Sequence, residues 1–373
     1  MFTRYNRDLF PNSVTVLILN WNGKELLETF LPSVVEYTPS GFAKVVVADN
    51  GSTDGSIEML KAKFPSVGII AFEKNLGFAE GYNQAMKQVH TPFSVLLNND
   101  VEVTPGWLDE PIDLLDSSIE IACVQPKIRS YHVRFKYEYA GAAGGFLDRY
   151  GYPFCRGRIF DTVENDFGQY DRPIDLLWAS GACMYVRTDT FKKEEGFDAN
   201  FFAHQEEIDF CWRLKARGYR IVFCYKAHVF HKGGATLDTA NPNKTFLNFR
   251  NNLLMIYKNM PKRRLRSVLF ARYFLDRLAA LRAYFTGNKD DARAILRAHR
   301  EFRKLKRTYR YTRFSNMRET KLASIPEIMN KSLLWAYYVK KRRTFPKLQF
   351  IKEVYMALPT EDSDMRDYFD LDY

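Results

Sequence analysis

Four short apolar runs punctuate the first hundred residues, and each ends in a polar turn. Continuous apolar and β-branched runs of this length are typical of strands buried on both faces. The segments between them have the apolar spacing of helices, and the alternation predicts parallel β-α-β units. We therefore expect residues 14–103 to form a doubly wound nucleotide-binding half. The predicted strands are Val14–Leu19, Lys44–Ala48, Val67–Phe72 and Phe93–Leu97, and the predicted helices are Lys24–Val35, Gly55–Phe64 and Gly77–Val89.

The middle of the chain mixes its patterns. Tyr139–Gly157 is rich in glycine and aromatic residues, which favours a loop, and Ile174–Val186 suggests a strand, a glycine break and a second strand. Ile208–Ala216 is predicted to be a helix and Arg220–Cys224 a strand. From Asn248 onward the pattern changes to long basic helical segments.

Composition and charge narrow the class of protein. The chain has 373 residues, 46% of them apolar, which is enough for a sizeable core. Five scattered cysteines without a CxxC pair favour a reducing cytosol over a zinc site or a disulfide frame. Neither a signal peptide nor an apolar run of membrane-spanning length is visible, so we expect a cytoplasmic protein.

The net charge of +11 is unevenly distributed. Residues 261–350 contain 25 Lys and Arg against 6 Asp and Glu, whereas residues 351–373 contain 2 against 7. A cationic helical segment with interspersed aromatics can lie on an anionic membrane, on the inner face of the cytoplasmic membrane in this case. It can equally be a helical hairpin packed on the rest of the protein. Nucleic-acid binding is the least favoured interpretation, because no recognised module accompanies the charge.

The first chemical signal is the strand end Asn98-Asn99-Asp100, with Glu102 two residues later. Ligands of open α/β sheets bind at the carboxyl ends of the strands. Carboxylate and amide oxygens there suit Mg²⁺ or Mn²⁺, with water and phosphate completing the shell. The local alternative is an ordinary strand end with a polar turn. His231, in His231-Lys232-Gly233-Gly234, is a second candidate ligand.

Two more strand ends carry polar groups. Asp49 precedes a glycine-bearing turn and can accept a hydrogen bond from a base or a ribose, or it can simply hold an Asx turn. Asn75 and Gly77 open a loop that leads into a helix. Neither a dinucleotide-binding GxGxxG motif nor a P-loop occurs in the sequence.

Three carboxylates, Glu206, Glu207 and Asp209, fall within four residues at a predicted helix start. Dipole compensation accounts for the two glutamates, and Asp209 with Arg213 has the spacing of a surface ion pair. The two phenylalanines just before the cluster suggest a buried setting, in which a carboxylate can serve as a general base.

Taken in order, these motifs resemble family 2 glycosyltransferases with the GT-A fold, and within that family bacterial rhamnosyltransferase-like enzymes. The similarity covers about Val14–Pro261 and rests on VTVLILNWNG, VVVADNGSTDGS, NLGFAEGYNQA, LLNNDVEVTPGWL, SGACMYVRTDTF, EEIDFCWRLKARG and HKGGAT. It implies a Rossmann-like α/β sheet, mixed but mostly parallel, in residues 1–260. Residues 261–373 would then be a basic α-helical extension with an acidic tail.

The resemblance also implies roles for individual residues. Asp100 and His231 would hold Mg²⁺ or Mn²⁺. Glu207 would be the catalytic base, with Glu206 or Asp209 as alternatives, because the family usually has Asp where Glu207 stands. The donor nucleotide sugar would be contacted by Asn20, Asn22, Asp49, Asn75, Gly77, Asn99, Ser180, Gly181 and Ala182.

The function implied is transfer of a sugar, with rhamnose one candidate, from a dTDP-, UDP- or GDP-linked donor. The acceptor would be a hydroxyl group of a cell-surface glycan or a polyprenyl-linked glycan, and the configuration would be inverted. The alternatives are a nucleotidyltransferase and a non-catalytic scaffold that retains the fold. We expect no nucleic-acid partner.

Overall fold

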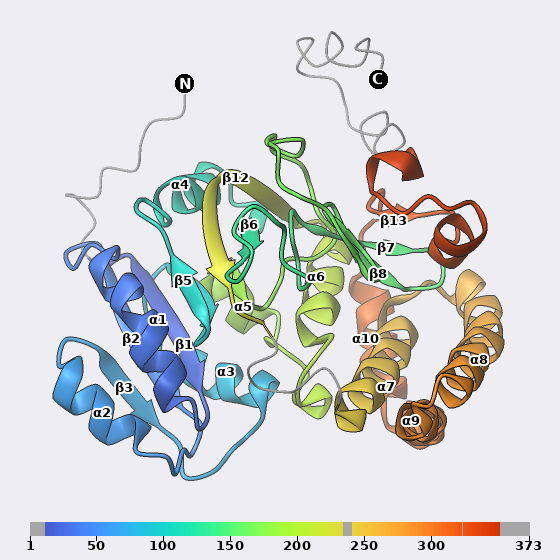
Figure 1. Ribbon diagram of the computed structural model, residues 1–373, viewed down its shortest axis with the longest axis horizontal. Coiled ribbons are helices and arrows are strands. Elements are labelled where there is room, and N and C mark those ends of the chain that lie inside the picture. The colour runs from blue at the N-terminus through green and yellow to red at the C-terminus, as the bar shows by residue number, and fades with distance from the viewer. Residues whose placement is uncertain (1–11, 234–240, 323, 351–373) are drawn as a thin grey trace, which may run out of the picture.

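The computed structural model describes residues 12–233, 241–322 and 324–350, and an eight-stranded mixed sheet forms its centre (Figure 1). The order across the sheet is β3-β2-β1-β4-β11-β6-β12-β5. Its strands are β1 (Val14–Asn20), β2 (Ala43–Asp49), β3 (Gly68–Ala71), β4 (Phe93–Asn98), β5 (Val101–Val103), β6 (Ile121–Ser130), β11 (Cys183–Arg187) and β12 (Arg220–His231).

The first four strands run parallel, which confirms the predicted β-α-β units. β1 lies between β2 and β4 and is in parallel register with both. Asn20 aligns with Asp49, and Leu19 aligns with Asn98. Three polar strand ends therefore meet at one edge of the sheet, because the carboxyl ends of parallel strands point the same way.

The second half of the sheet is mixed. β11 is antiparallel to both β4 and β6, whereas β12 is parallel to β6 and antiparallel to β5. The pairing of β12 with β5 sets His231 opposite Val101. Two predicted metal ligands are thus neighbours through sheet register, although they are far apart in sequence.

Helices cover both faces of this sheet, since its inner strands are apolar on both sides. Val16 and Ile18 of β1 belong to the core beneath α1, α2 and α4, whereas Leu17 belongs to the core beneath α3, α5 and α6. These helices are α1 (Lys24–Glu36), α2 (Ser56–Lys63), α3 (Phe78–Lys87), α4 (Asp109–Ser117), α5 (Thr188–Lys193) and α6 (Glu206–Ala216).

A second sheet corrects the prediction for the middle of the chain. Tyr139–Gly157 is not a loop, because it contributes two strands, and the first predicted strand of Ile174–Val186 is absent from the structure. A Cβ atom on Gly145 would collide with the Trp178 ring, so glycine is what lets this strand pack there. The strand order of this second sheet is β10-β9-β8-β7-β13. Its strands are β7 (Gly145–Asp148), β8 (Pro153–Cys155), β9 (Arg158–Ile159), β10 (Thr162–Val163) and β13 (Ile328–Met329).

The C-terminal helices form the end of the molecule opposite β3 and α2 (Figure 1). They share the main core rather than standing apart from it: Phe345 packs on Phe146 and Phe154, with ring centroids 5.4 and 6.0 Å apart. Within the described ranges, no helix combines the length and the apolar character that a membrane crossing requires. The C-terminal elements are α7 (Pro242–Asn259), α8 (Lys262–Phe285), α9 (Lys289–Thr308), α10 (Arg310–Glu319), the π-helix η3 (Trp335–Val339) and the short 3-10 helix η4 (Pro346–Leu348). Another short 3-10 helix, η2 (Ala199–Phe201), lies earlier in the chain, just before α6.

Candidate active site

The carboxyl ends of β1 and β2 form a buried hydrogen-bond network. Asn20 Nδ2 donates to Asp49 Oδ2 over 3.1 Å, and Asp49 Oδ1 accepts from the backbone N–H of Ser52 at 2.8 Å. The second bond holds the turn after β2, although it reaches three residues along the chain rather than the two of the Asx turn that the sequence left open as an alternative. Asn22 Oδ1 accepts from the backbone N–H of Thr53 at 2.8 Å. These bonds fix the shape of the edge at which we expect the nucleotide.

The loop before α3 joins the same edge. Asn50 Nδ2 donates to Asn75 Oδ1 over 3.1 Å and to the carbonyl of Gly77 over 3.0 Å. Gly77 has a φ of 83°, and a Cβ atom there would lie 2.5 Å from the Phe202 ring. Only glycine fits this position, and the close contact couples the loop to the segment before α6.

Asp100 and His231 form a buried pair beside the turn from β4 to β5. His231 Nε2 lies 3.1 Å from Asp100 Oδ1, and His231 Nδ1 lies 3.3 Å from Glu138 Oε2. Burial opposes the charge on His231, but the two carboxylates outweigh it and raise the pKa of His231 well above its usual value. Asn99 Nδ2 donates to Asn20 Oδ1 over 2.8 Å, which ties this pair to the network at β1.

The Asp100–His231 pair fits two adjacent ligands of an octahedral cation. With Mg²⁺–ligand distances of about 2.1 Å, neighbouring ligands are about 3.0 Å apart, close to the spacing observed. A ligating imidazole usually donates its other N–H to a carboxylate. Glu138 lies beside the buried Nδ1 of His231, which has no hydrogen-bond partner among the described residues. In the described part of the chain, no three His, Cys, Asp or Glu side chains surround a cation position. Substrate and water would therefore supply the other ligands.

Glu138 was missed by sequence reasoning. It lies between β6 and β7, outside any strand-end or helix-start signal, and only the fold brings it to His231. It also lines an open cavity of about 370 Å³, together with Lys136, Tyr139 and Lys232. The HKGGAT motif that begins at His231 continues through Gly234–Thr236, which lie outside the described residues.

The predicted loop Ser180-Gly181-Ala182 lies between the end of β4, next to Asp100, and the start of α6, where Glu206 and Glu207 stand. The backbone N–H of Asn98 donates to the carbonyl of Ala182 over 3.0 Å. A Cβ atom on Gly181 would be 4.0 Å from Cβ of Glu207. The loop thus contacts the end of β4 on one side and the start of α6 on the other.

The segment that enters α6 has an unusual backbone. Phe202, His204 and Gln205 have φ values of 64°, 69° and 71°. Non-glycine residues rarely adopt this left-handed conformation, and such strain gathers at functional sites. This turn places Glu206 and Glu207 at the start of the helix.

Glu206 and Glu207 are shifted toward their neutral forms. Burial, reinforced by the charge of Glu207, raises the pKa of Glu206 well above its usual value. Burial also raises the pKa of Glu207 to about 7, although the first N–H groups of α6 favour its carboxylate. One oxygen of each group has no hydrogen-bond partner among the described residues. A half-buried carboxyl group that titrates near neutrality suits a general base.

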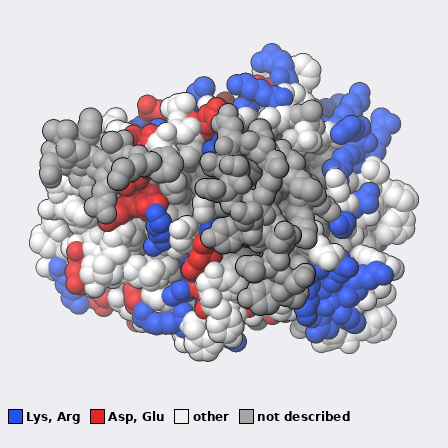
Figure 2. Space-filling model, turned by 90° about the horizontal axis from the view of Figure 1, so that it is seen from above, with Lys and Arg blue, Asp and Glu red and all other residues white. Residues whose placement is uncertain are grey.

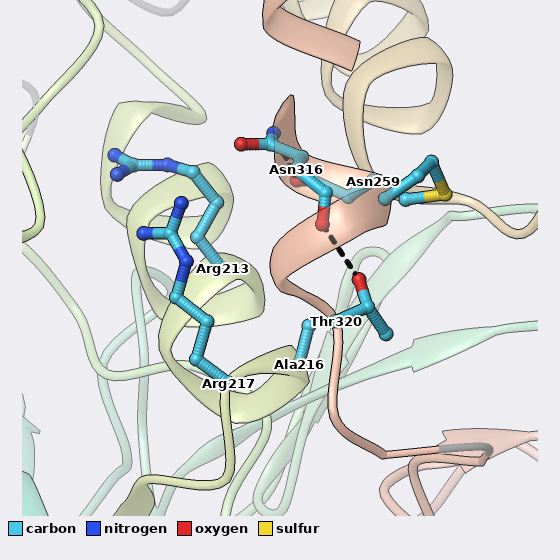
Figure 3. A pocket seen from close by; sticks show the side chains of 7 residues that line it. Arg213, Ala216, Arg217, Asn259, Asn316 and Thr320 are labelled. Carbon is cyan, nitrogen blue, oxygen red and sulfur yellow. Dashed lines mark hydrogen bonds between the residues drawn. The ribbon is translucent and has the colours of Figure 1, made fainter. Parts of the chain in front are cut away.

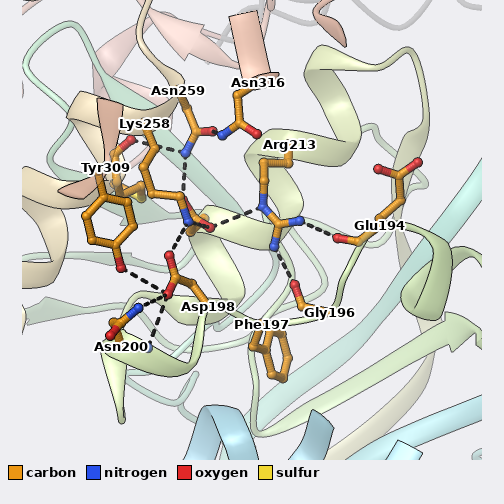
Figure 4. Close-up of polar contacts among 12 residues, drawn as sticks. Glu194, Gly196, Phe197, Asp198, Asn200, Arg213, Lys258, Asn259, Tyr309 and Asn316 are labelled. Atoms are coloured by element: carbon orange, nitrogen blue, oxygen red, sulfur yellow. Dashed lines mark hydrogen bonds and ion pairs between the residues drawn. The ribbon is translucent and has the colours of Figure 1, made fainter. Parts of the chain in front are cut away.

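Asp209 has a different environment. Its Oδ2 lies 2.7 Å from Lys258 Nζ and 3.2 Å from Arg213 Nε, and its Oδ1 accepts from Asn259 Nδ2 over 2.7 Å. Figure 4 shows Arg213, Lys258 and Asn259 converging in this cluster. The ion pair with Arg213 has the spacing that the sequence offered as an alternative for Asp209, but the pair is buried and not on the surface.

A small pocket at the other end of α6 is not a substrate site. It lies between α6 and α10, is lined by Arg213, Arg217 and Asn316 among others, and is too narrow for a water molecule (Figure 3). The Thr320 hydroxyl donates to the carbonyl of Asn316 over 2.8 Å and helps to close it.

A path of contacts joins the Asp100–His231 pair to the Glu206–Glu207 pair. The backbone N–H of Ala140 donates to Glu138, and the carbonyl of Ala140 accepts from the Ser180 hydroxyl. The next residue, Gly181, faces Glu207. Ala140, Ser180 and Gly181 therefore link the candidate metal site to the candidate bases, although these residues are far apart in sequence.

Comparisons with known proteins bear on the family and the fold. The model of glycosyl transferase family 2 matches residues 15–184. The N-acetylglucosaminyl-diphospho-decaprenol L-rhamnosyltransferase of Mycobacterium tuberculosis is 28% identical over 222 residues, which cover 55% of this chain and 71% of that protein. The O-antigen biosynthesis protein RfbC of Myxococcus xanthus is 25% identical over 226 residues, covering 60% of this chain but only 17% of that protein.

Solved structures agree on the fold. GalNAc-T7, crystallised with UDP, GalNAc and Mn²⁺, has a TM-score of 0.53 at 14% identity over 66% of this chain and 48% of its own. TarS 1-349 of S. aureus, in complex with UDP-GlcNAc, has a TM-score of 0.50 at 14% identity over 82% of this chain and 89% of its own.

The family match, the named relatives and the fold identify a glycosyltransferase enzyme with the GT-A fold. The match to glycosyl transferase family 2 covers residues 15–184, and the chain is similar to an L-rhamnosyltransferase and to an O-antigen biosynthesis protein. The family match favours this class over the nucleotidyltransferase and scaffold alternatives.

Proposed function

We propose that the enzyme transfers a sugar from a nucleotide-diphosphate donor to a hydroxyl group of a glycan or lipid-linked acceptor, with inversion at the anomeric carbon. The observation that carries this proposal is the contact path between the Asp100–His231 pair and the Glu206–Glu207 pair. It supports a diphosphate at Asp100 and His231 beside a base at the start of α6. The relatives' names make rhamnose the first sugar to test and a polyprenyl-diphosphate glycan the first acceptor.

The donor nucleoside would lie along the carboxyl ends of β1 and β2. Asn20 and Asp49 are buried there, and Asn22, Asn75 and Gly77 border the same edge. Amides and backbone groups of this kind can recognise the edge of a base and the ribose hydroxyls. The sequence leaves dTDP, UDP and GDP as candidate carriers.

The diphosphate would lie at Asp100 and His231, which would hold Mg²⁺ or Mn²⁺. A bound divalent cation there would offset the negative charge of the departing nucleoside diphosphate. Asn99 and the Ser180–Ala182 loop would border the donor sugar, because they lie between the strand ends and α6.

Glu207 would take the proton from the acceptor hydroxyl as its oxygen attacks the anomeric carbon. The bond from this carbon to the diphosphate oxygen breaks in the same step, so one displacement inverts the configuration. Glu207 suits this role better than Asp209, whose two oxygens are occupied by Lys258, Arg213 and Asn259. Glu206 is more deeply buried than Glu207.

The test of the base replaces Glu207 with Gln, which keeps the shape and removes the proton acceptor. We expect transfer to fall by about a hundredfold or more, while the thermal shift caused by the donor sugar nucleotide persists. Transfer close to that of the unmodified enzyme would remove Glu207 from the mechanism.

The test of the metal site replaces Asp100 with Asn and uses Glu102→Gln as its matched control. Glu102 lies two residues away but forms an exposed ion pair with Arg134 at 2.7 Å. A thermal-shift series with dTDP-, UDP- and GDP-sugars should show a donor shift that requires Mg²⁺ or Mn²⁺. The shift should disappear in Asp100→Asn and remain in Glu102→Gln. Equal shifts in both variants would contradict the assignment of Asp100.

A further inference from the structure

Helix α8 buries two charged residues beside its buried apolar ones. Its buried face includes Arg272 and Asp276, whose Nε and Oδ1 atoms are 2.9 Å apart, and His299 Nε2 lies 2.8 Å from the other oxygen of Asp276. An ordinary surface helix buries its apolar face and exposes its charges. The outer face of α8, in contrast, carries large exposed apolar side chains.

That outer face is a continuous apolar stripe. Successive members are separated by four, four, three and four residues, which keeps them on one side of a helix. Their side chains are 52–77% exposed. Single exposed apolar residues are ordinary, but a contiguous patch on a soluble domain marks a contact surface. The stripe consists of Phe270, Phe274, Leu278, Leu281 and Phe285.

The π-helix η3 widens the stripe. Arg282 Nη1 donates to the Tyr338 hydroxyl over 3.1 Å, which brings η3 against the C-terminal half of α8. Trp335 and Val339 of η3 are 58% and 53% exposed. The chain then continues through the basic residues 340–343. The α8–η3 face, as we name this surface, therefore combines aliphatic side chains, aromatic rings and cations.

Cations surround this face. Arg263 and Arg266 extend the outer side of α8 toward its N-terminus, and both are exposed. Arg277 lies over the Tyr273 ring with 3.3 Å between its Cζ atom and the ring centroid. Figure 2 shows Lys and Arg gathered over the end of the molecule that α8 and α9 occupy, with uncharged side chains between them. An apolar centre with a basic and aromatic border is the composition of interfacial helices.

We propose that the α8–η3 face docks on the surface of an anionic lipid bilayer. Charge selects this partner over a second copy of the chain, because residues 261–350 contain 25 Lys and Arg against 6 Asp and Glu, and two such faces would repel each other. An anionic bilayer matches both parts of this face, because its negative surface attracts the cations and its interior accepts the apolar side chains. The inference goes beyond the transfer reaction and does not depend on its donor, acceptor or metal.

The test is co-sedimentation of the whole protein with vesicles. Neutral vesicles contain phosphatidylcholine, and anionic vesicles also contain phosphatidylglycerol. The unmodified protein should bind the anionic vesicles, and the double variant Phe274→Gln with Leu278→Gln should bind them about tenfold less or weaker still. Ile119→Gln is the matched control, because Ile119 is 74% exposed on the distant α4–β6 turn and should not affect binding.

A charge variant separates the electrostatic contribution to vesicle binding from the apolar contribution. Arg263→Gln with Arg266→Gln keeps the apolar stripe and should reduce the preference for anionic vesicles, as raised salt should. Both double variants alter exposed residues, so their thermal unfolding should match that of the unmodified protein. Equal vesicle binding by the Phe274/Leu278 variant and the unmodified protein would overturn the proposal. So would a dimer in solution that this variant converts to monomer without any vesicle binding, because the face would then be a protein interface.

Discussion

At the scale of single residues, Glu207 shows how surroundings change the chemistry of a side chain. An exposed glutamate is ionised well below neutrality. Burial at the start of α6 raises the pKa of Glu207 to about 7, against the helix N–H groups that favour its charge. Desolvation therefore exceeds local hydrogen bonding here. The result is a carboxylate that holds a proton firmly enough to act as a base near neutral pH.

This shift predicts the pH dependence of transfer. Only ionised Glu207 can accept the proton of the acceptor, so kcat/KM should rise with pH and level off above about pH 7. Below that value the logarithm of kcat/KM should fall by about one unit per pH unit. A profile that stays flat between pH 5 and 8, with the chemical step shown to limit the rate, would contradict this assignment. The residual activity of Glu207→Gln should lack this limb.

At the scale of elements, α7 holds the strained turn that enters α6. Asn251 is fully buried, and its Nδ2 donates to the carbonyls of Phe201, Ala203 and His204 over 2.8–2.9 Å. Each left-handed non-glycine residue costs about 1–3 kcal/mol unless the surroundings hold it. One amide therefore fixes the backbone that aims Glu207.

We predict that Asn251→Ala lowers kcat more than it raises KM for the donor. The substitution leaves three carbonyls without this donor, which should cost about 1–3 kcal/mol of stability, and it frees the turn before Glu207. Steady-state kinetics and urea unfolding would measure both effects. Asn243→Ala, at the exposed first turn of the same helix, is the control and should change neither quantity. Normal kcat in a destabilised Asn251→Ala would make the residue structural only.

The elements differed in how far their sequences revealed them. β1 and β4 are buried on both faces, so their apolar runs predicted them directly. β7 is four residues long and begins at Gly145, which packs beneath Trp178, so composition suggested a loop. The outer stripe of α8 was also hidden, because periodicity locates an apolar face but does not say whether the fold covers it.

The candidate site was predictable to the same degree. Asp100 and Glu207 follow recognisable element boundaries, so local sequence pointed to them. Glu138 has no such signal, because only the pairing of β12 with β6 and β5 brings His231 to it. The role of Asp209 also required the fold, since Lys258 approaches from a helix 49 residues away.

At the scale of the whole molecule, the C-terminal helices are fastened to the catalytic half by buried charges. Lys258 of α7 pairs with Asp209 of α6 and with Asp198, both at 2.7 Å. Tyr309, just before α10, donates to Asp198 over 3.0 Å (Figure 4). β13 adds a parallel strand to β7 from a position near the end of the described chain. The basic extension therefore belongs to the body that carries the site.

Replacing Lys258 with Met tests this connection. The side chain is 2% exposed, and its removal leaves the buried carboxylate of Asp209 and the partly buried carboxylate of Asp198 short of a cation. This should lower the free energy of unfolding by about 3 kcal/mol or more. Lys63→Met is the control, because Lys63 also pairs at 2.7 Å, with Glu28, but is 60% exposed. Exposed pairs contribute about 1 kcal/mol at most. Urea unfolding should therefore show a larger loss of stability for Lys258→Met than for Lys63→Met, although the ion pairs have the same length. Equal losses of unfolding free energy would show that the Lys258 cluster does not hold the C-terminal helices to the catalytic half.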